Sequence, residues 1–105
     1  MNYNIEESYR YSFGIISHTE ASPVEVILSF DPQQGKYIKS LPLHETQEII
    51  IDNEDELRIS LTVHITHDFI IELLSYGGDV KVIAPIYFAE QIKEAHFDAY
   101  KLYDR

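Results

Sequence analysis

The stretch "ELRISLTVHI", residues 56–65, decides the fold because its apolar residues alternate with polar ones along its length. In an extended chain one face carries Leu57, Ile59, Leu61, Val63 and Ile65, and the other carries Arg58, Ser60, Thr62 and His64. Such alternation is typical of a β-strand with one face in a core and the other face outside it. We therefore predict a strand of an antiparallel sheet that is covered on one side.

The residues before this strand predict its hairpin partner and a βα unit. A strand is expected around Thr46 to Asp52, and the acidic run 53–55 forms the turn between the two strands. Further upstream, "VEVILSF", residues 24–30, also alternates. Asp31 suits a helix N-cap, Pro32 suits the first helical position, and a short helix is predicted through about Ser40.

The residues after the strand predict a second helix with clear boundaries. Thr66 can cap a helix through "HDFIIELLSY", residues 67–76, and Gly77-Gly78 can end it with a left-handed backbone. The buried stripe of that helix is expected to be Phe69, Ile70, Leu73 and Leu74.

A last strand and a last helix complete the chain. "DVKVIA", residues 79–84, is predicted as the fourth strand, and Pro85 opens the final helix. The covered side of this helix is expected to carry Phe88, Ile92, Ala95, Ala99 and Leu102.

The element order β-α-β-β-α-β predicts an α+β, ferredoxin-like sandwich with an added C-terminal helix. Two right-handed crossovers place both helices on one face of a four-stranded antiparallel sheet. Residues 1–12 are expected to be a lead-in or linker, and residues 13–105 to be one domain. The other face of the sheet stays open unless a partner or the C-terminal helix covers it, and it carries Ile27, Ser29, Arg58, Ser60, Thr62, His64, Lys81 and Ile83.

The charge of the chain argues against general binding to duplex DNA. Eight Lys and Arg stand against eighteen Asp and Glu, which gives a net charge of -10. Duplex binders are usually basic, because their cations displace condensed counterions. The chain has no Cys and no apolar run of transmembrane length, so we expect a cytoplasmic protein without disulfides or membrane contact.

The segment "PLHETQEIIID", residues 42–52, resembles half of a zinc-protease motif. His44 is followed by Glu45, but Glu48 stands where H-E-x-x-H has its second His. The segment leads into a strand, so the helical spacing that brings two imidazoles together is absent. The simpler interpretation is a polar entry to the strand, with His44 and Gln47 satisfying backbone or neighbouring groups.

Other patterns point weakly to chemistry. His64 and His67 could meet a metal at a strand-helix junction, with Asp68 as a third ligand, although local hydrogen bonds are the commoner role of such residues. Eight Tyr and five Phe suggest base stacking, but the expected open face carries polar residues in place of aromatic ones. No catalytic arrangement, metal site or cofactor motif is predicted, and the chain is not expected to be an enzyme.

Four segments, in this order, resemble a known family: "YSFGII" (11–16), "VEVILSF" (24–30), "LPLHETQEI" (41–49) and "FIIELLSYGGDVKVIAP" (69–85), with "IKEAHFDAYKLY" closing the chain. They are similar to the C-terminal extension, called WCX, that follows the WYL domain of bacterial transcriptional regulators. The similarity runs from about Phe13 to Tyr103.

Two short motifs carry the resemblance to WCX. The family's H-x-S-Q at the strand entry is matched by His44, Thr46 and Gln47, with Thr in place of Ser. The helix-strand joint L-x-x-G-x-x-V-x-V-x-x-P is matched by Leu74, Gly77, Val80, Val82 and Pro85. Ala84 stands where the family usually has a Ser before that Pro, so a helix cap is lost.

The resemblance implies a regulatory role. Such regulators carry an N-terminal winged helix-turn-helix that binds duplex DNA, then a WYL domain, then this extension. The WYL and WCX parts are thought to sense a ligand, in some members single-stranded nucleic acid, and to help the regulator dimerise. The chain is thus expected to be an effector-sensing or dimerisation domain taken from a longer regulator.

A nucleic-acid or other anionic effector needs cations on this acidic background. The candidate ligand-binding residues are Lys36, Lys39, His44, Gln47 and Arg58. The alternative is a ligand-free interaction module that buries its open sheet face or a sheet edge in a homodimer.

Overall fold

The computed structural model describes residues 22–104 of the chain. The predicted lead-in, residues 1–12, and the predicted start of the domain, residues 13–21, lie outside this range. The elements in chain order are β1 (Val24–Phe30), α2 (Pro32–Ser40), β2 (Glu48–Asp52), β3 (Leu57–Val63), α3 (His67–Ser75), η1 (Gly77–Asp79), β4 (Val80–Ala84) and α4 (Ile86–Tyr103).

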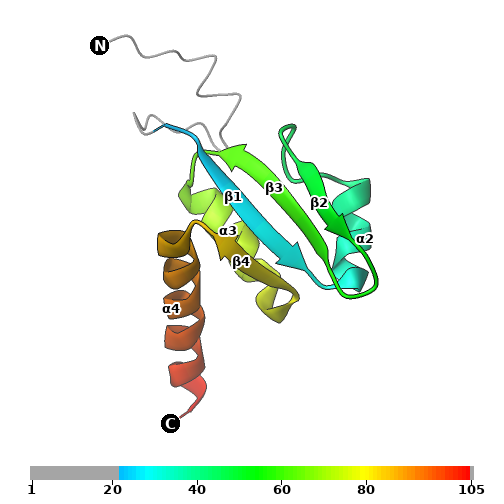
Figure 1. The fold of residues 1–105 in the computed structure, drawn as a ribbon. Helices are drawn as coiled ribbons and strands as arrows, with labels where there is room; N and C mark the ends of the chain where they lie inside the picture. The colour runs from blue at the N-terminus through cyan, green and yellow to red at the C-terminus, as the bar shows by residue number, and fades with distance from the viewer. Residues whose placement is uncertain (1–21, 105) are drawn as a thin grey trace, which may run out of the picture.

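The four strands form one antiparallel sheet in the order β2-β3-β1-β4 (Figure 1). In this order β1 and β3 are central, and β2 and β4 are the edges. Phe30 of β1 faces Leu57 of β3 and Val80 of β4, so the apolar residues of three strands share one side of the sheet. The predicted α+β fold with a four-stranded antiparallel sheet is confirmed.

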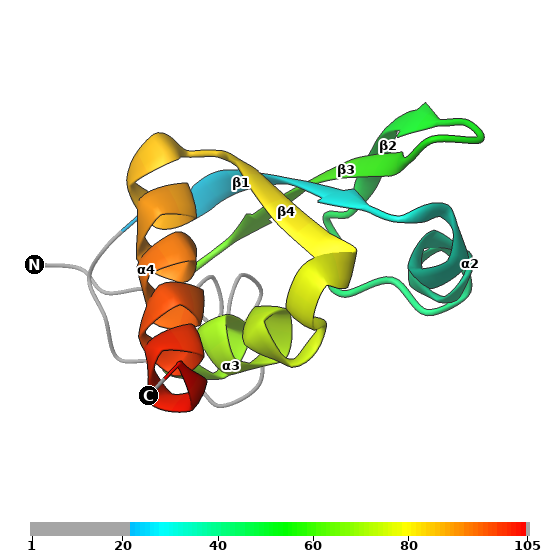
Figure 2. The ribbon, with the colours of Figure 1, turned by 90° about the horizontal axis from the view of Figure 1, so that it is seen from below.

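All three α-helices lie on the same side of the sheet (Figure 2). The C-terminal helix α4 packs beside β4 and α3, and it extends away from the sheet at its C-terminal end. It therefore does not cover the opposite face of the sheet. Among the described residues no helix lies on that opposite face.

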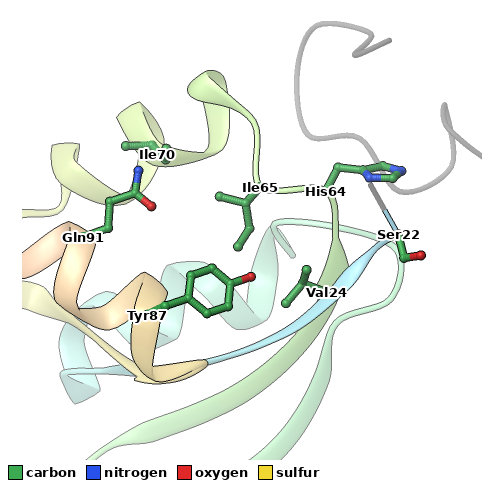
Figure 3. A pocket seen from close by; sticks show the side chains of 7 residues that line it. All are labelled: Ser22, Val24, His64, Ile65, Ile70, Tyr87 and Gln91. Carbon is green, nitrogen blue, oxygen red and sulfur yellow. The ribbon is translucent and has the colours of Figure 1, made fainter. Parts of the chain in front are cut away.

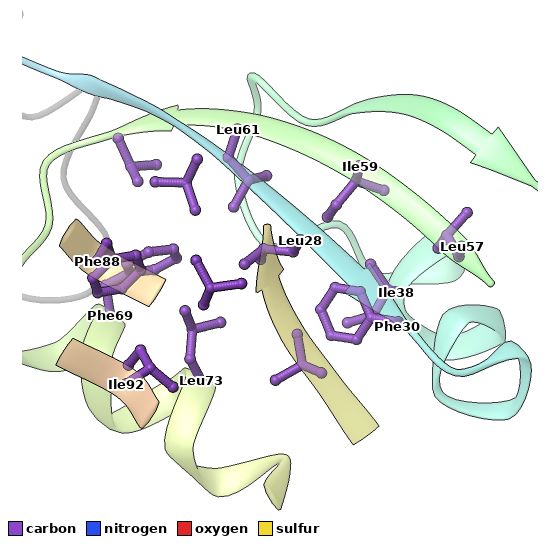
Figure 4. Packing of buried hydrophobic residues seen from close by; sticks show 14 residues of the cluster. Leu28, Phe30, Ile38, Leu57, Ile59, Leu61, Phe69, Leu73, Phe88 and Ile92 are labelled. Atoms are coloured by element: carbon purple, nitrogen blue, oxygen red, sulfur yellow. The ribbon is translucent and has the colours of Figure 1, made fainter. Parts of the chain in front are cut away.

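The hydrophobic core lies between the sheet and the helices (Figure 4). Most residues of the predicted apolar faces of β1 and β3 are buried there, as are Phe69 and Leu73 of α3, while Val24, Ile65, Ile70 and Leu74 are partly buried. The rings of Phe69 and Phe88 stack with their centroids 5.8 Å apart, which joins α3 to α4. The buried cluster comprises Val26, Leu28, Phe30, Ile38, Leu57, Ile59, Leu61, Val63, Phe69, Leu73, Val80, Val82, Phe88 and Ile92.

The helix boundaries follow the capping residues predicted from the sequence. The Asp31 carboxylate accepts a hydrogen bond from the Gln34 backbone N–H at 2.7 Å, and the Thr66 hydroxyl accepts one from the Phe69 N–H at 3.2 Å. Gly77 has a φ of 58°, the left-handed conformation that ends α3. Pro85, which was expected to be the first residue of the last helix, is instead the N-cap of α4 and makes no side-chain capping bond.

Three predicted details are wrong. His64 lies one residue beyond the end of β3 at Val63 and is only 6% exposed, so it is not an exposed residue of the open face. Ala99 and Leu102 are exposed, because the end of α4 extends beyond the core. The strand β2 begins at Glu48, since the residues before it form a turn closed by a backbone bond from Gln47 N–H to the His44 carbonyl.

Gly35 marks the closest approach of α2 to the sheet, and this leads to a prediction. A Cβ atom at Gly35 would lie 2.8 Å from the Cβ of Leu57, which cannot rotate away. Overpacking of this kind typically lowers the stability by about 1–3 kcal/mol, while the better helix propensity of Ala offsets about 1 kcal/mol of this loss. We expect Gly35→Ala to lower the free energy of unfolding by about 1 kcal/mol in chemical denaturation.

Gly78→Ala is the matched control, because a Cβ atom there meets nothing within 4 Å. It should change the free energy of unfolding by less than about 0.5 kcal/mol. A Gly35→Ala protein as stable as the unmodified chain would show that α2 moves away from β3 without cost.

Candidate functional site

The open face of the sheet carries a row of polar side chains on three adjacent strands. Ser29 of β1 lies opposite Arg58 of β3 on one side and opposite Lys81 of β4 on the other. Side chains of directly opposed residues are neighbours on the same face, with Cβ atoms about 5 Å apart. The row therefore places one cation on each side of the Ser29 hydroxyl.

Glu56, two residues before Arg58, completes this row. Its Oε2 atom accepts a hydrogen bond from the Ser29 hydroxyl at 2.5 Å and one from Arg58 Nε at 3.1 Å. Its Oε1 atom accepts from Arg58 Nη2, also at 3.1 Å, so the guanidinium and the carboxylate pair through two parallel bonds. We call the four residues Ser29, Glu56, Arg58 and Lys81 the open-face cluster.

These contacts stabilise the charged form of Glu56. The Ser29 hydroxyl is the largest influence that lowers the pKa of Glu56 below its ordinary value of 4.5, and Arg58 and Lys81 add to it. Partial burial raises the pKa of Glu56, but the lowering by these contacts is larger. Glu56 is thus ionised at neutral pH and neutralises part of the positive charge of the cluster.

The lowered pKa of Glu56 predicts a pH dependence of stability. Its contribution is complete above the unfolded value of 4.5 and is lost as the pH falls through the lower folded value. We expect the melting temperature of the unmodified chain to exceed that of Glu56→Gln at about pH 7, and this difference to shrink below about pH 4.5. Thermal unfolding followed by circular dichroism measures it, and a difference independent of pH would contradict the prediction.

The family motif at His44, Thr46 and Gln47 has a structural use. The Gln47 side chain accepts a hydrogen bond from the Leu43 N–H at 2.9 Å and donates one to the Ile38 carbonyl at 3.1 Å. It therefore ties the loop after α2 to the last turns of that helix. The simpler interpretation of Gln47, that it satisfies backbone groups, is confirmed.

Thr46 extends the sheet where β2 has not yet begun. Its hydroxyl accepts from the Thr62 N–H at 2.9 Å and donates to the Thr62 carbonyl at 3.2 Å. A side chain thereby takes the place of a strand backbone beside β3. The Nδ1 atom of His44 accepts from the Thr46 N–H at 3.1 Å and lies 2.8 Å from the Thr46 hydroxyl, so it orients Thr46.

The two candidate lysines lie on the helix side of the sheet. The Nζ atom of Lys39 is 3.1 Å from a carboxylate oxygen of Asp52, which joins α2 to β2. Lys36 and Lys39 line a pocket of about 350 Å³ together with Asp52 and Glu54, so the pocket carries charges of both signs. Arg58 points the other way, because its neighbours Leu57 and Ile59 face the core.

The structure therefore separates the five candidate residues into three places. Lys36 and Lys39 are on α2, His44 and Gln47 support the loop before β2, and Arg58 is in the open-face cluster. Sequence reasoning had placed Arg58 on the open face without a carboxylate beside it. The spacing of Glu56 and Arg58, two residues apart at the start of a strand, was the available signal.

A second pocket of about 280 Å³ lies where β1, β3, α3 and α4 meet (Figure 3). Its walls are mainly apolar, and the Tyr87 ring reaches from α4 toward Val24 of β1. The lining residues are Ser22, Val24, His64, Ile65, Ile70, Tyr87 and Gln91.

The alternative of a metal site at His64 and His67 gains no support from residues 22–104. His64 is buried whereas His67 is exposed. No group of three or more His, Asp or Glu residues in that range is arranged to hold a metal ion. Of the helices between Ser22 and Asp104, none combines the length and apolar character needed to cross a membrane.

Comparison with known proteins gives one family. The family model of the WCX domain matches residues 22–99, which is most of the chain. The match covers every strand of the sheet, the loop that Thr46 and Gln47 support, and most of α4. A search of curated proteins found none that matches this chain.

Proposed function

The chain belongs to the WCX domain family, the C-terminal domains of WYL-type transcriptional regulators, and on this premise we propose that it senses an anionic effector through its open sheet face. The observation that carries the proposal is the row of Lys81, Ser29 and Arg58 on three adjacent strands. These residues are hydrogen-bond donors of the kind that bind phosphate oxygens.

The charge of the chain favours single-stranded nucleic acid, or another phosphorylated effector, over duplex DNA. With a net charge of -10 the domain repels a long duplex, but two cations can engage one or two phosphates locally. Recognition of duplex operators then belongs to a winged helix-turn-helix on the same regulator, and the WYL domain is the neighbouring partner. The proposal assigns this domain no catalytic step and no cofactor, and it places the regulator in the cytoplasm.

Fluorescence anisotropy with labelled oligonucleotides at several salt concentrations tests the proposal. For single strands, the logarithm of the binding constant falls with the logarithm of salt by about 0.7 per phosphate neutralised. We expect a slope of about -1.4 for the two cations Arg58 and Lys81, and weaker binding to duplex. Arg58→Gln should reduce the slope to about -0.7.

Lys93→Gln is the matched control, because Lys93 is an exposed cation on α4, on the other side of the sheet. It removes one positive charge from the chain but should leave the salt slope unchanged. If Lys93→Gln and Arg58→Gln reduced the salt slope equally, the open face would not be the binding surface. Repeating the titration with the WYL domain attached shows whether that domain completes the site.

A ligand-free homodimer is the second candidate function, and the edge strand β2 is the feature that favours it. Ile49 and Ile50 on that edge are 53% and 49% exposed. Antiparallel self-pairing centred on Ile50, however, would place Glu48 opposite Asp52 of the second copy, and like charges directly opposed are destabilising. Sedimentation of the chain without oligonucleotide decides this, since a stable dimer would favour the second candidate.

The same proposal includes the ferredoxin-like arrangement within the α+β class. It is supported by the β-α-β-β-α-β order of the first six main elements and by the strand order β2-β3-β1-β4. Further support comes from α2 and α3 lying on one side of the sheet (Figure 2).

A further inference from the structure

We propose that Ser29, Arg58 and Lys81 form a binding site for a phosphate group and that the Glu56 carboxylate occupies this site as an internal competitor. The effector then binds by displacing Glu56. This inference rests on the proposed function in one respect, namely that the open face receives an anionic effector.

The hydrogen bonds of Glu56 are those that a phosphate would make. Its two oxygens accept from Nε and Nη2 of Arg58, both at 3.1 Å, and one of them also accepts from Ser29. A phosphate presents two oxygens to a guanidinium in the same parallel geometry, and a third oxygen remains for the ammonium of Lys81. The carboxylate thus stands in for the bound anion.

The Glu56 side chain can leave without opening the hairpin. The backbone N–H of Glu56 donates to the Asn53 side-chain oxygen at 2.9 Å, and the Glu56 carbonyl accepts from the Asn53 N–H at 3.1 Å. These bonds hold the turn independently of the carboxylate. The side chains of Arg58 and Glu56 are 32% and 22% exposed, so solvent, and hence a ligand, reaches the pair.

The charges and donors of the open-face cluster favour phosphate over the competing carboxylate of Glu56. With Glu56 in place the cluster carries two positive charges and one negative charge, and displacement leaves two positive charges facing the ligand. Phosphate brings at least as much negative charge to the two cations as Glu56 does, and its third oxygen adds a contact with Lys81 that a carboxylate lacks. The site should therefore bind phosphate more tightly than acetate.

Isothermal titration of the chain with inorganic phosphate tests the inference. Glu56→Gln removes the competitor and should bind phosphate about tenfold more tightly than the unmodified chain. Glu54→Gln is the matched control, because Glu54 is exposed in the same hairpin and is the same residue type. It removes the same charge outside the cluster and should change the affinity by less than about twofold.

Glu56→Asp separates displacement from net charge. It keeps the charge of the chain but shortens the side chain by one methylene, so the carboxylate no longer reaches both Ser29 and Arg58. We expect tighter phosphate binding than in the unmodified chain, and acetate should bind each variant more weakly than phosphate does. Adding Arg58→Gln to Glu56→Gln should abolish the gain. Circular dichroism of each variant confirms that it is folded.

Equal phosphate affinities in Glu56→Gln and Glu54→Gln would overturn the inference, as would the absence of phosphate binding in both. A parallel titration with a single-stranded oligonucleotide separates the two proposals. Oligonucleotide binding that is unchanged in both Glu56→Gln and Arg58→Gln overturns the inference and the open face as the binding surface, whereas binding that is weakened by Arg58→Gln but unchanged by Glu56→Gln overturns the inference alone. Phosphate binding as expected without oligonucleotide binding supports the site and assigns it to a small phosphorylated effector.

Discussion

Replacing Phe69 with Ala lowers the free energy of unfolding by about 3–5 kcal/mol, the usual cost of truncating a buried Phe. Phe69 is fully buried, and its ring stacks on that of Phe88. The substitution removes the contact that joins α3 to α4 and leaves a cavity beneath the sheet. Because small domains are stable by only about 5–15 kcal/mol, the loss is a large part of the total.

Phe97→Ala is the control for this prediction. Phe97 lies on α4 with 56% of its surface exposed, and it contacts the Lys101 ammonium 5.0 Å from its ring centroid. Its replacement should cost less than about 1 kcal/mol in urea denaturation. Similar losses for Phe69→Ala and Phe97→Ala would mean that α3 and α4 are not held by the core described here.

Replacing Thr46 with Val lowers the free energy of unfolding by about 2 kcal/mol. Valine has nearly the shape of threonine but lacks the hydroxyl that bonds both the N–H and the carbonyl of Thr62. Both backbone groups lose their partner beside β3, and an unsatisfied, partly buried group costs about 1–3 kcal/mol.

Thr46→Ser is the control for this prediction. It keeps the hydroxyl and loses only a methyl group, so its cost should stay below about 1 kcal/mol. If Thr46→Val and Thr46→Ser were equally stable, the hydroxyl bridge to Thr62 would not hold the loop before β2.

Much of the fold could be predicted because the local preferences of the residues match the places where the structure buries or caps them. The alternation of 56–65 forecast the buried face of β3, since a half-covered strand needs a period of two. Asp31 and Thr66 forecast helix starts, since their side chains satisfy backbone N–H groups that lack a partner within the helix. Gly77 forecast the end of α3 through its left-handed backbone.

The details that could not be predicted depend on tertiary geometry. His64 continues the alternation of β3 in the sequence, yet it lies just beyond the end of the strand at Val63 and is buried. Ala99 and Leu102 keep the helical spacing of the predicted covered side of α4 but are exposed. The register that sets Lys81 and Arg58 on either side of Ser29 joins three strands far apart in the chain.

For the candidate site too, one part could be predicted from the sequence and another part depends on tertiary contacts. Arg58 was predicted correctly as an open-face cation, whereas the contacts of Gln47 and Lys39 are explained by loop support and by pairing with Asp52. Residue type alone does not distinguish a cation or amide that supports the fold from one that faces a ligand. The neighbours of each side chain supply that distinction.

Nuclear magnetic resonance of the isotope-labelled chain, titrated with a single-stranded oligonucleotide, tests most directly whether the open face receives an anionic effector. The predicted result is that the largest shift changes fall on Ser29, Arg58 and Lys81, with α2 unaffected. The contradictory result is that they gather at Lys36 and Lys39 while the open face stays unchanged. In that case the helix side of the sheet, and not the open-face cluster, would be the binding surface.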